Sequence, residues 1–308
     1  MKRRFFLGSL AASAALAGAR TVAEERQADA KSSLVILHTN DTHSHLDPLS
    51  ELYSKNAGLG GVARRAALIK RVRRENPNVL LLDSGDMFQG TPYFNLFGGE
   101  VEFKVMTAMG YDIATLGNHE FDNGVDGLVK QLPHAGFEFV CANYDMTDTP
   151  LADTVKPFTT RQFGDFKVGI FGLGIAFDGL VLASAHQGVS YQDPILVARR
   201  MVDELREQGC HFIVCLSHLG HRYRNDKVGD INLAAEVSGI DLILGGHTHT
   251  FLDEPELVDD PQNVPTMIQQ VGCFGVRLGR IDVDFNPFDH SVATTAGQYT
   301  LDRIARLA

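Results

Sequence analysis

The sequence predicts an α/β fold in which central mixed β-sheets are flanked by helices. Short apolar runs recur along the chain, and their hydrophobicity is continuous rather than alternating, as in strands that are covered on both faces. Helix-like segments separate these runs. Near the end of the chain, glycines and a partial alternation of apolar and polar residues indicate antiparallel strands that join the sheet. The continuous runs are residues 34–37, 79–82, 113–116, 137–141, 168–173, 212–216 and 242–244.

The first nineteen residues are interpreted as an export signal. They join positive charges to a modestly apolar, alanine-rich run that ends in an A-x-A cleavage pattern at 17–19. Arg3 and Arg4, followed by Phe-Phe-Leu, are typical of a twin-arginine signal, although an ordinary secretory signal is the alternative. We expect a signal peptide at 1–19, a flexible lead at 20–33, and a periplasmic or secreted protein. No run reaches about eighteen apolar residues, so no membrane span is expected.

One helix before the run at 212–216 carries clear start and stop signals. Asp193 can cap the first turn, Pro194 fits the first helical position, and Gly209 ends the segment. The pattern predicts a βα unit here. With no repeat of fixed period and no long linker in the sequence, a single domain over 34–308 is expected.

The charge pattern argues against a nucleic-acid polymer as the partner. The formal net charge is −10, whereas proteins that bind a phosphate backbone present basic surfaces. A basic run at 64–74 surrounds an apolar stripe at helical spacing, which favours a solvated helix face over an anion-binding patch.

The cysteines show no paired spacing that is typical of a metal site. Most of them lie in apolar surroundings, so buried free thiols are expected, and a disulfide stays open as an alternative in an exported protein. The cysteines are Cys141, Cys210, Cys215 and Cys273.

Five of the predicted strands end in a polar cluster. Ligands of open α/β sheets gather beyond the carboxyl ends of the strands, so these five turns should converge. Each cluster alone is a weak signal, but five that all supply nitrogen and oxygen donors are a strong one. The clusters are "HTNDTHSH" at 38–45, "DSGD" at 83–86, "GNHE" at 117–120, "SHLGH" at 217–221 and "GGHTH" at 245–249.

The joint donor set predicts a metal centre at these strand ends. Imidazole and carboxylate donors without thiolates suit Mn, Zn or Fe(II). Seven ligands are more than one ion needs, and they suffice for two divalent ions about 3.5–4 Å apart if one carboxylate bridges them. The candidate ligands are Asp41, His43, Asp86, Asn118, His218, His247 and His249.

His119 is left over from this ligand set. A histidine beside the ions can protonate a leaving group if a neighbouring group fixes its tautomer. Asp122, in the same turn, is the expected orienting group. Glu120 is expected to order the loop, while Asn40, His45 and His221 are weaker candidates for lining a phosphate pocket.

These motifs, in this order, resemble those of the calcineurin-like metallophosphoesterases. Longer stretches are similar to the catalytic domain of bacterial 5'-nucleotidases, and the resemblance covers about residues 33–285. It implies the layered metallophosphoesterase fold, with the metal site at the carboxyl ends of the strands. The longer stretches are "ILHTNDTHSHL", "GGVARRAALIKRV", "LLDSGDMFQGTPYFNLFGGE" and "ATLGNHEFDNG".

The resemblance also implies a role for each candidate residue. His119 and Asp122 match the catalytic dyad, and a hydroxide held between the metals would attack phosphorus in line. This makes an exported phosphomonoesterase of the 5'-nucleotidase type the leading hypothesis. The implied ligand sets are Asp41, His43 and His249 for one metal, Asn118, His218 and His247 for the other, and Asp86 as the bridge.

The substrate stays open, because bacterial 5'-nucleotidases carry a second, C-terminal domain that supplies the nucleoside pocket. The sequence is expected to lack that domain, so a nucleoside-binding domain encoded separately could dock in trans, with the apolar segment 87–99 as its candidate surface. The expected substrate is a phosphate ester, with a nucleotide as the leading candidate. A phosphodiesterase acting on cyclic nucleotides and a non-catalytic metal or nucleotide binder are the alternatives.

Overall fold

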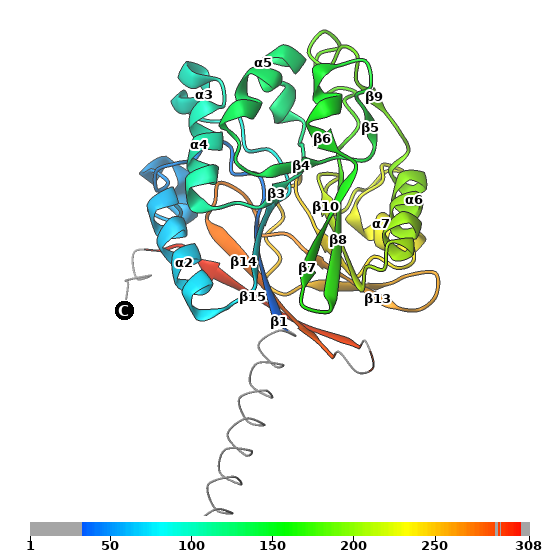
Figure 1. Cartoon of the computed structure of the whole chain (residues 1–308). Helices are drawn as coiled ribbons and strands as arrows, with labels where there is room; N and C mark the ends of the chain where they lie inside the picture. The colour runs from blue at the N-terminus through cyan, green and yellow to red at the C-terminus, as the bar shows by residue number, and fades with distance from the viewer. Residues whose placement is uncertain (1–32, 287–288, 290, 303–308) are drawn as a thin grey trace, which may run out of the picture.

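The computed structural model describes residues 33–286, 289 and 291–302 (Figure 1). The predicted signal peptide at 1–19 and almost all of the lead at 20–33 lie outside these residues. Among the described residues, no helix is both long and apolar enough to cross a membrane.

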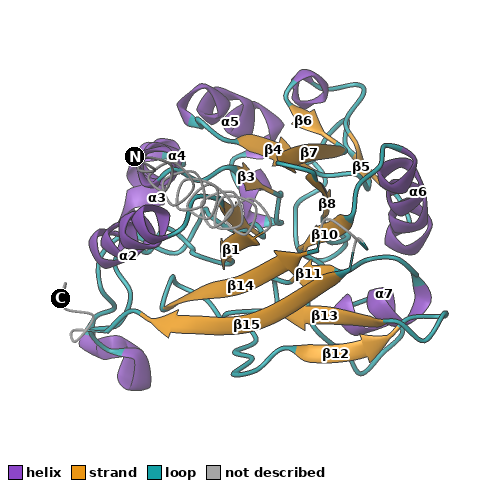
Figure 2. Cartoon of the chain, turned by 60° about the horizontal axis from the view of Figure 1, so that its bottom comes forward, coloured by secondary structure: helices purple, strands orange, loops and turns teal. Residues whose placement is uncertain are grey.

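A seven-stranded mixed sheet forms one half of the molecule. Its central strands run parallel, while β14 runs antiparallel to β1 with Leu34 opposite Val283, and β15 is antiparallel to β14 at the sheet edge (Figure 2). The strands in spatial order are β15 (Val292–Thr300), β14 (Arg277–Phe285), β1 (Ser33–Thr39), β2 (Val79–Asp83), β3 (Ile113–Ala114), β4 (Glu138–Val140) and β6 (Val155–Lys156).

A six-stranded mixed sheet forms the other half. Four parallel strands lie between two antiparallel edge strands. In spatial order they are β12 (Glu256–Asp259), β13 (Pro265–Gln269), β11 (Leu242–Leu244), β10 (Phe212–Ser217), β8 (Phe166–Leu173) and β7 (Phe158–Phe163). A short antiparallel pair, β5 (Tyr144–Asp145) and β9 (Ser190–Tyr191), stands apart.

The two sheets pack face to face, and helices cover their outer faces. Side chains of a strand alternate between faces, so Ile36 of β1 joins an inter-sheet core with Val214, while Leu37 packs against the helices on the outer side. Burial on both sides explains why the runs read as continuously apolar.

The helices form two separate layers. Figure 1 shows α2, α3 and α4 on one side of the molecule and α6 and α7 on the other, with the sheets between them. The α-helices are α2 (Val62–Glu75), α3 (Pro92–Phe97), α4 (Glu100–Met109), α5 (Gly124–Gln131), α6 (Pro194–Glu207) and α7 (Asp230–Glu236). Short 3-10 turns are η1 (Glu51–Asn56), η2 (His119–Phe121), η3 (Leu132–His134) and η4 (Pro150–Asp153).

The predicted fold class and the helix signals are confirmed. The Asp193 side chain accepts hydrogen bonds from the backbone N–H groups of Ile195 and Leu196, at 2.8 and 3.1 Å, and Pro194 begins α6. Gly209 follows the helix with φ 78°, a conformation that glycine adopts without strain.

The basic run behaves as predicted with one exception. Most of it lies on the outer side of α2, but Arg65 is only 3% exposed. Arg65 lies one turn before Ile69, on the buried face of the helix. Burial raises the pKa of Asp83, and the positive charge of Arg65 opposes this rise. Helical spacing identified the stripe but not this inward arginine.

The segment 87–99 is not a continuous exposed patch. Met87, Phe88 and Phe94 are at most 6% exposed and belong to the core beneath α3 and α4. Among its large apolar side chains, only Leu96 and Phe97 have large exposed fractions, 76% and 48%. The predicted docking surface is therefore confined to the outer side of α3.

Candidate metal centre

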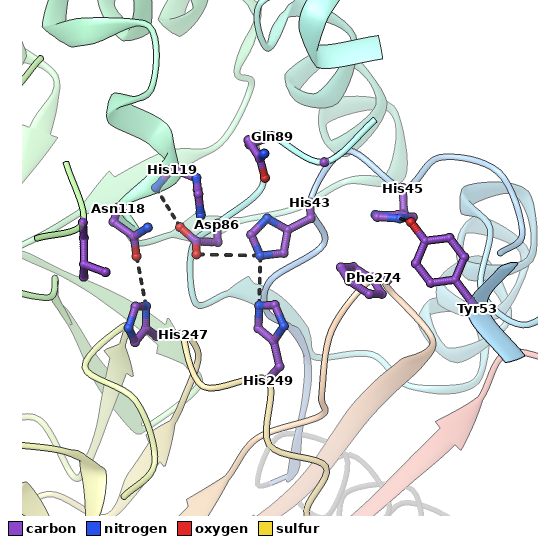
Figure 3. Close-up of a pocket in the computed structure, with 12 residues that line it drawn as sticks. His43, His45, Tyr53, Asp86, Gln89, Asn118, His119, His247, His249 and Phe274 are labelled. Carbon is purple, nitrogen blue, oxygen red and sulfur yellow. Dashed lines mark hydrogen bonds and ion pairs between the residues drawn. The ribbon is translucent and has the colours of Figure 1, made fainter. Parts of the chain in front are cut away.

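Both sheets contribute side chains to one site at the carboxyl ends of their strands. The loops after β1, β2 and β3 supply Asp41, His43, Asp86 and Asn118, and the loops after β10 and β11 supply the three remaining histidines. Figure 3 shows His43, Asp86 and Asn118 facing His247 and His249 across the site. The predicted convergence of five strand ends is therefore seen in the structure.

Two groups of donors adjoin each other at Asp86. In the first, Nε2 of His249 lies 3.3 Å from Oδ1 of Asp41 and 3.0 Å from Nε2 of His43. In the second, Nε2 of His218 lies 3.0 Å from Oδ2 of Asp86, and His247 belongs to the same cluster.

Asn118 and Asp86 complete the two groups. Oδ1 of Asn118 lies 2.9 Å from Nδ1 of His247, and Oδ2 of Asp86 lies 3.8 Å from Nε2 of His43. Asp86 thus lies within reach of both groups, as a bridging ligand would. The donor atoms in each His/Asp cluster lie within 4.8 Å of one another.

The hydrogen bonds around two histidines fit a metal-binding role. Nδ1 of His43 lies 3.1 Å from the carbonyl oxygen of Phe88, and Nδ1 of His218 lies 2.6 Å from that of Ser84. A carbonyl can only accept, so each Nδ1 carries a proton, and in the neutral ring each Nε2 has a lone pair for a cation. Burial alone would lower the pKa of His218, but Asp86, whose Oδ2 lies 3.0 Å from Nε2, raises it to about 10, and a cation bound between them would replace the Nε2 proton.

This arrangement fits two divalent ions with nitrogen and oxygen ligands. The facing Nε2 atoms of His43 and His249, 3.0 Å apart, can share either a proton or a cation. The assignment of each ligand to a particular ion, and the choice among Mn, Zn and Fe, stay predictions.

Asn40 holds the first carboxylate in place and does not line the pocket. Its Nδ2 donates to Oδ2 of Asp41 at 2.6 Å and to the carbonyl of Gly272, while its Oδ1 accepts from the N–H of Val271. It thereby ties the loop after β1 to the segment after β13.

Glu120 orders two loops, as predicted. Its buried carboxylate accepts four backbone hydrogen bonds, three from the loop after β2 and one from the loop after β3. The distances are 2.9 Å from the N–H of Asp86, 2.8 Å from Met87, 3.2 Å from Phe88 and 2.7 Å from Gly117. The position of Asp86 therefore depends on this side chain.

Charges inside the site alter the titration of its groups. Burial alone would raise the pKa of Asp86, but the adjacent His218 outweighs it and holds the pKa well below the usual range. Burial lowers the pKa of His43, and that of His247 to about 4, which keeps both rings neutral and able to bind a cation.

His119 lies beside the donor groups and pairs with Asp122. Nδ1 of His119 lies 2.9 Å from Oδ2 of Asp122, and the His119 ring centre lies 5.2 Å from that of His43. Burial lowers the pKa of His119, but the hydrogen bond and charge of Asp122 outweigh it and the net pKa is raised. The pair has the geometry expected of a proton donor and its orienting group.

Backbone strain is concentrated at this site. Among the described residues, every non-glycine residue with positive φ except Asn263 lies in a loop around the site. Such conformations persist only where surrounding contacts fix them, and they gather at functional sites. These residues are Asp41, His43, Ser44, Asp86, Gln89, His247, His249 and Phe274.

Of the two histidines that were weaker candidates for lining the pocket, the structure places one at the cavity and the other away from it. His45 borders the cavity of about 370 Å³ over the donor groups. His221 instead lies 3.0 Å from Oε2 of Glu256 and is not among the cavity's lining residues. The four cysteines are buried and free, as expected.

Sequence reasoning missed five residues that also line the cavity. Single loop residues carry no spacing pattern, and only the glycines around Phe274 in "GCFG" hinted at a sharp turn there. The missed residues are Tyr53, Gln89, Gly90, Leu180 and Phe274.

Comparison with known proteins agrees with the fold. The family model of the calcineurin-like phosphoesterases matches residues 34–251. The 5'-nucleotidase of Bos taurus is 37% identical over 277 residues, which cover 82% of this chain and 46% of the bovine protein.

Solved structures give the same result. The 5'-nucleotidase precursor of Thermus thermophilus matches with a TM-score of 0.79 and 34% identity over 89% of this chain and 55% of that one. The NAD nucleotidase of Haemophilus influenzae matches with a TM-score of 0.76 and 29% identity over 87% of this chain and 50% of that one. The chain thus spans about half the length of these relatives, and it belongs to the calcineurin-like phosphoesterase family.

Proposed function

We propose that the chain is an exported, dinuclear-metal phosphoric-ester hydrolase of the 5'-nucleotidase type, acting as a phosphomonoesterase on nucleotides. One observation carries this proposal. Two His/Asp donor groups adjoin each other at Asp86, and the His119–Asp122 pair lies beside them. Similarity to proteins named 5'-nucleotidases supports the substrate class.

The residues of the chain divide the work. One ion would be held by Asp41, His43 and His249. The other ion would be held by Asn118, His218 and His247, and Asp86 would bind both ions. When bound, the two ions would activate water for in-line attack and neutralise charge on the phosphoryl oxygens.

His119 would donate a proton to the leaving oxygen. Asp122 accepts the Nδ1 proton of His119, so the Nε2 of the ring is the nitrogen directed at substrate. The positive charge of His119 would also stabilise the negative charge that develops on the leaving oxygen.

A turnover assay with matched esters tests this function. The purified, Mn-loaded protein should hydrolyse AMP, GMP and p-nitrophenyl phosphate within about tenfold of one another, and bis(p-nitrophenyl) phosphate and cyclic AMP more slowly. Faster turnover of the diesters would favour the phosphodiesterase alternative. Bound metal without turnover of any ester would favour a non-catalytic binder.

A nucleoside-binding domain supplied in trans stays a prediction. Its docking surface would have to use the exposed Leu96 and Phe97 on α3. If the purified chain alone preferred AMP over the aryl phosphate by about a thousandfold, no such domain would be needed for specificity.

A further inference from the structure

Three aromatic rings form one side of the cavity next to the donor groups. We call His45, Tyr53 and Phe274 the aromatic wall. Figure 3 shows the wall beyond His43 and His249, on the side away from Asn118 and His247. The proposed chemistry uses none of the three side chains.

Phe274 is held in a conformation that an aromatic residue rarely adopts. It has φ 60°, it is half-buried, and its N–H donates to the carbonyl oxygen of Asp41 at 2.7 Å. Its ring centre lies 5.9 Å from that of His43 and 5.8 Å from that of His249. A positive φ at an aromatic residue beside a site indicates that the backbone is held there to orient the side chain for function.

The other two rings are fixed against Phe274. The ring centre of His45 lies 4.2 Å from that of Phe274, with an interplanar angle of 35°. Nε2 of His45 lies 2.8 Å from the hydroxyl of Tyr53, whose ring centre is 5.5 Å from Phe274. Rings that are already ordered lose little conformational entropy when a ligand packs on them.

The wall and the donor groups share one cavity. This cavity, of about 370 Å³, is lined by Asp86 and His119 as well as by all three rings of the wall. The ring of His43 lies between the two parts, because its centre is 5.2 Å from that of His119 and 5.9 Å from that of Phe274. A group attached to the oxygen that His119 protonates therefore lies within reach of the wall.

The chemistry of the wall favours a flat, uncharged group. The wall consists of three rings that line the cavity, and the hydroxyl of Tyr53 is already bonded to His45. Ring faces attract planar bases through stacking without reading their hydrogen-bonding edges. The wall should therefore bind a nucleobase without distinguishing adenine from guanine.

We propose that the aromatic wall is a subsite for the nucleobase of the leaving group, with Phe274 as its main specificity-determining residue. The inference rests on the proposed function and places part of the nucleoside recognition within the catalytic domain itself. The ring of an aryl phosphate could stack on the wall in the same way as a nucleobase. Nucleotide and aryl substrates are therefore compared separately.

AMP and ribose 5-phosphate are the matched pair for the test. Both release a primary 5'-hydroxyl, and they differ at the anomeric carbon, which carries adenine in AMP and a hydroxyl in ribose 5-phosphate. The wild-type protein should favour AMP in kcat/KM by about tenfold, the range of one base stacked on an aromatic side chain. Phe274→Ala and Tyr53→Ala should bring this ratio towards one, and p-nitrophenyl phosphate reports separately on an aryl group.

The exposed neighbour Leu52, 93% exposed on the same turn as Tyr53, provides the matched control. Leu52→Ala should keep the wild-type ratio. A merely structural role of Phe274 would lower kcat/KM for AMP and ribose 5-phosphate by the same factor and leave their ratio unchanged, and that result would overturn the proposal.

A binding measurement tests the wall without catalysis. The chain contains no tryptophan, so a Phe274→Trp variant carries a single tryptophan, at the wall, which can be excited selectively. Adenosine should change its fluorescence in a saturable manner, and ribose should not. The Leu257→Trp variant, at a 61% exposed position on β12, is the control and should not respond.

These two readouts separate the hypotheses. If the wild-type protein hydrolyses no phosphate ester but adenosine still binds at the Phe274→Trp position, the proposed function fails and the wall is a nucleobase-binding site without a leaving-group role. If esters are hydrolysed but the Phe274→Trp and Leu257→Trp variants respond alike to adenosine, the wall proposal fails alone.

Discussion

Replacing Glu120 with glutamine tests whether one carboxylate fixes the bridging aspartate. Each oxygen of Glu120 accepts two backbone N–H groups, from Asp86 and Gly117 on one side and from Met87 and Phe88 on the other. An amide keeps one oxygen and turns an NH₂ group towards the other pair. Two buried N–H groups are then left facing a donor.

The magnitude follows from these contacts. A buried donor that loses its acceptor costs about 1–3 kcal/mol, so Glu120→Gln should lower the free energy of unfolding by roughly 2–6 kcal/mol. In a domain of this size, about 1 kcal/mol corresponds to about 2–4 °C in Tm. The expected decrease in Tm is roughly 4–24 °C.

Thermal unfolding followed by circular dichroism should be measured in EDTA, so that bound metal does not add to the stability. Glu236→Gln, an exposed glutamate on α7, is the control and should change Tm by no more than about 2 °C. Titration with Mn should then show weaker binding to Glu120→Gln, because Asp86 is no longer fixed. A wild-type Tm together with wild-type Mn affinity would refute the reasoning.

The site and the N-terminus give four further predictions. Asp86→Asn should weaken Mn binding at least about tenfold and lower activity, as measured by metal analysis and turnover, and full metal content would exclude a bridging role. His119→Asn should keep both metals and lose about 10²–10⁴ in kcat, whereas loss of metal would show that His119 is a ligand. Asp122→Asn removes the partner that raises the pKa of His119, so the fall of kcat with rising pH should begin at lower pH than in the wild type. Replacing Arg3 and Arg4 with lysine should leave precursor in the cytoplasm on cell fractionation, and unchanged export would indicate the general secretory route.

Periodicity and strand-end motifs predicted the layers and the gathering of the donors, because both depend on local sequence. The predicted strand at 113–116 is shorter in the structure, and β15 was not predicted. Its residues, such as Thr294 and Gln298, are polar or small, since much of the strand is exposed.

Long-range partners account for the remaining differences. Arg65 lies inward, where its charge acts on Asp83 of a different element, and no sequence signal marks this proximity. Likewise, nothing in the segment around Tyr53 indicates that it meets Phe274, more than two hundred residues away. Contacts of this kind are decided by packing rather than by propensity.

The pairing of β1 with β14 sets the order in which the site can be assembled. β1 carries the loop with Asp41 and His43, and its second edge is covered only by residues 277–285. During synthesis, this edge keeps unpaired backbone groups and apolar side chains exposed until β14 has left the ribosome. Both sheets must also be present before the two donor groups can meet. A complete metal site can therefore form only after all of the strands from β1 to β14 have been synthesised.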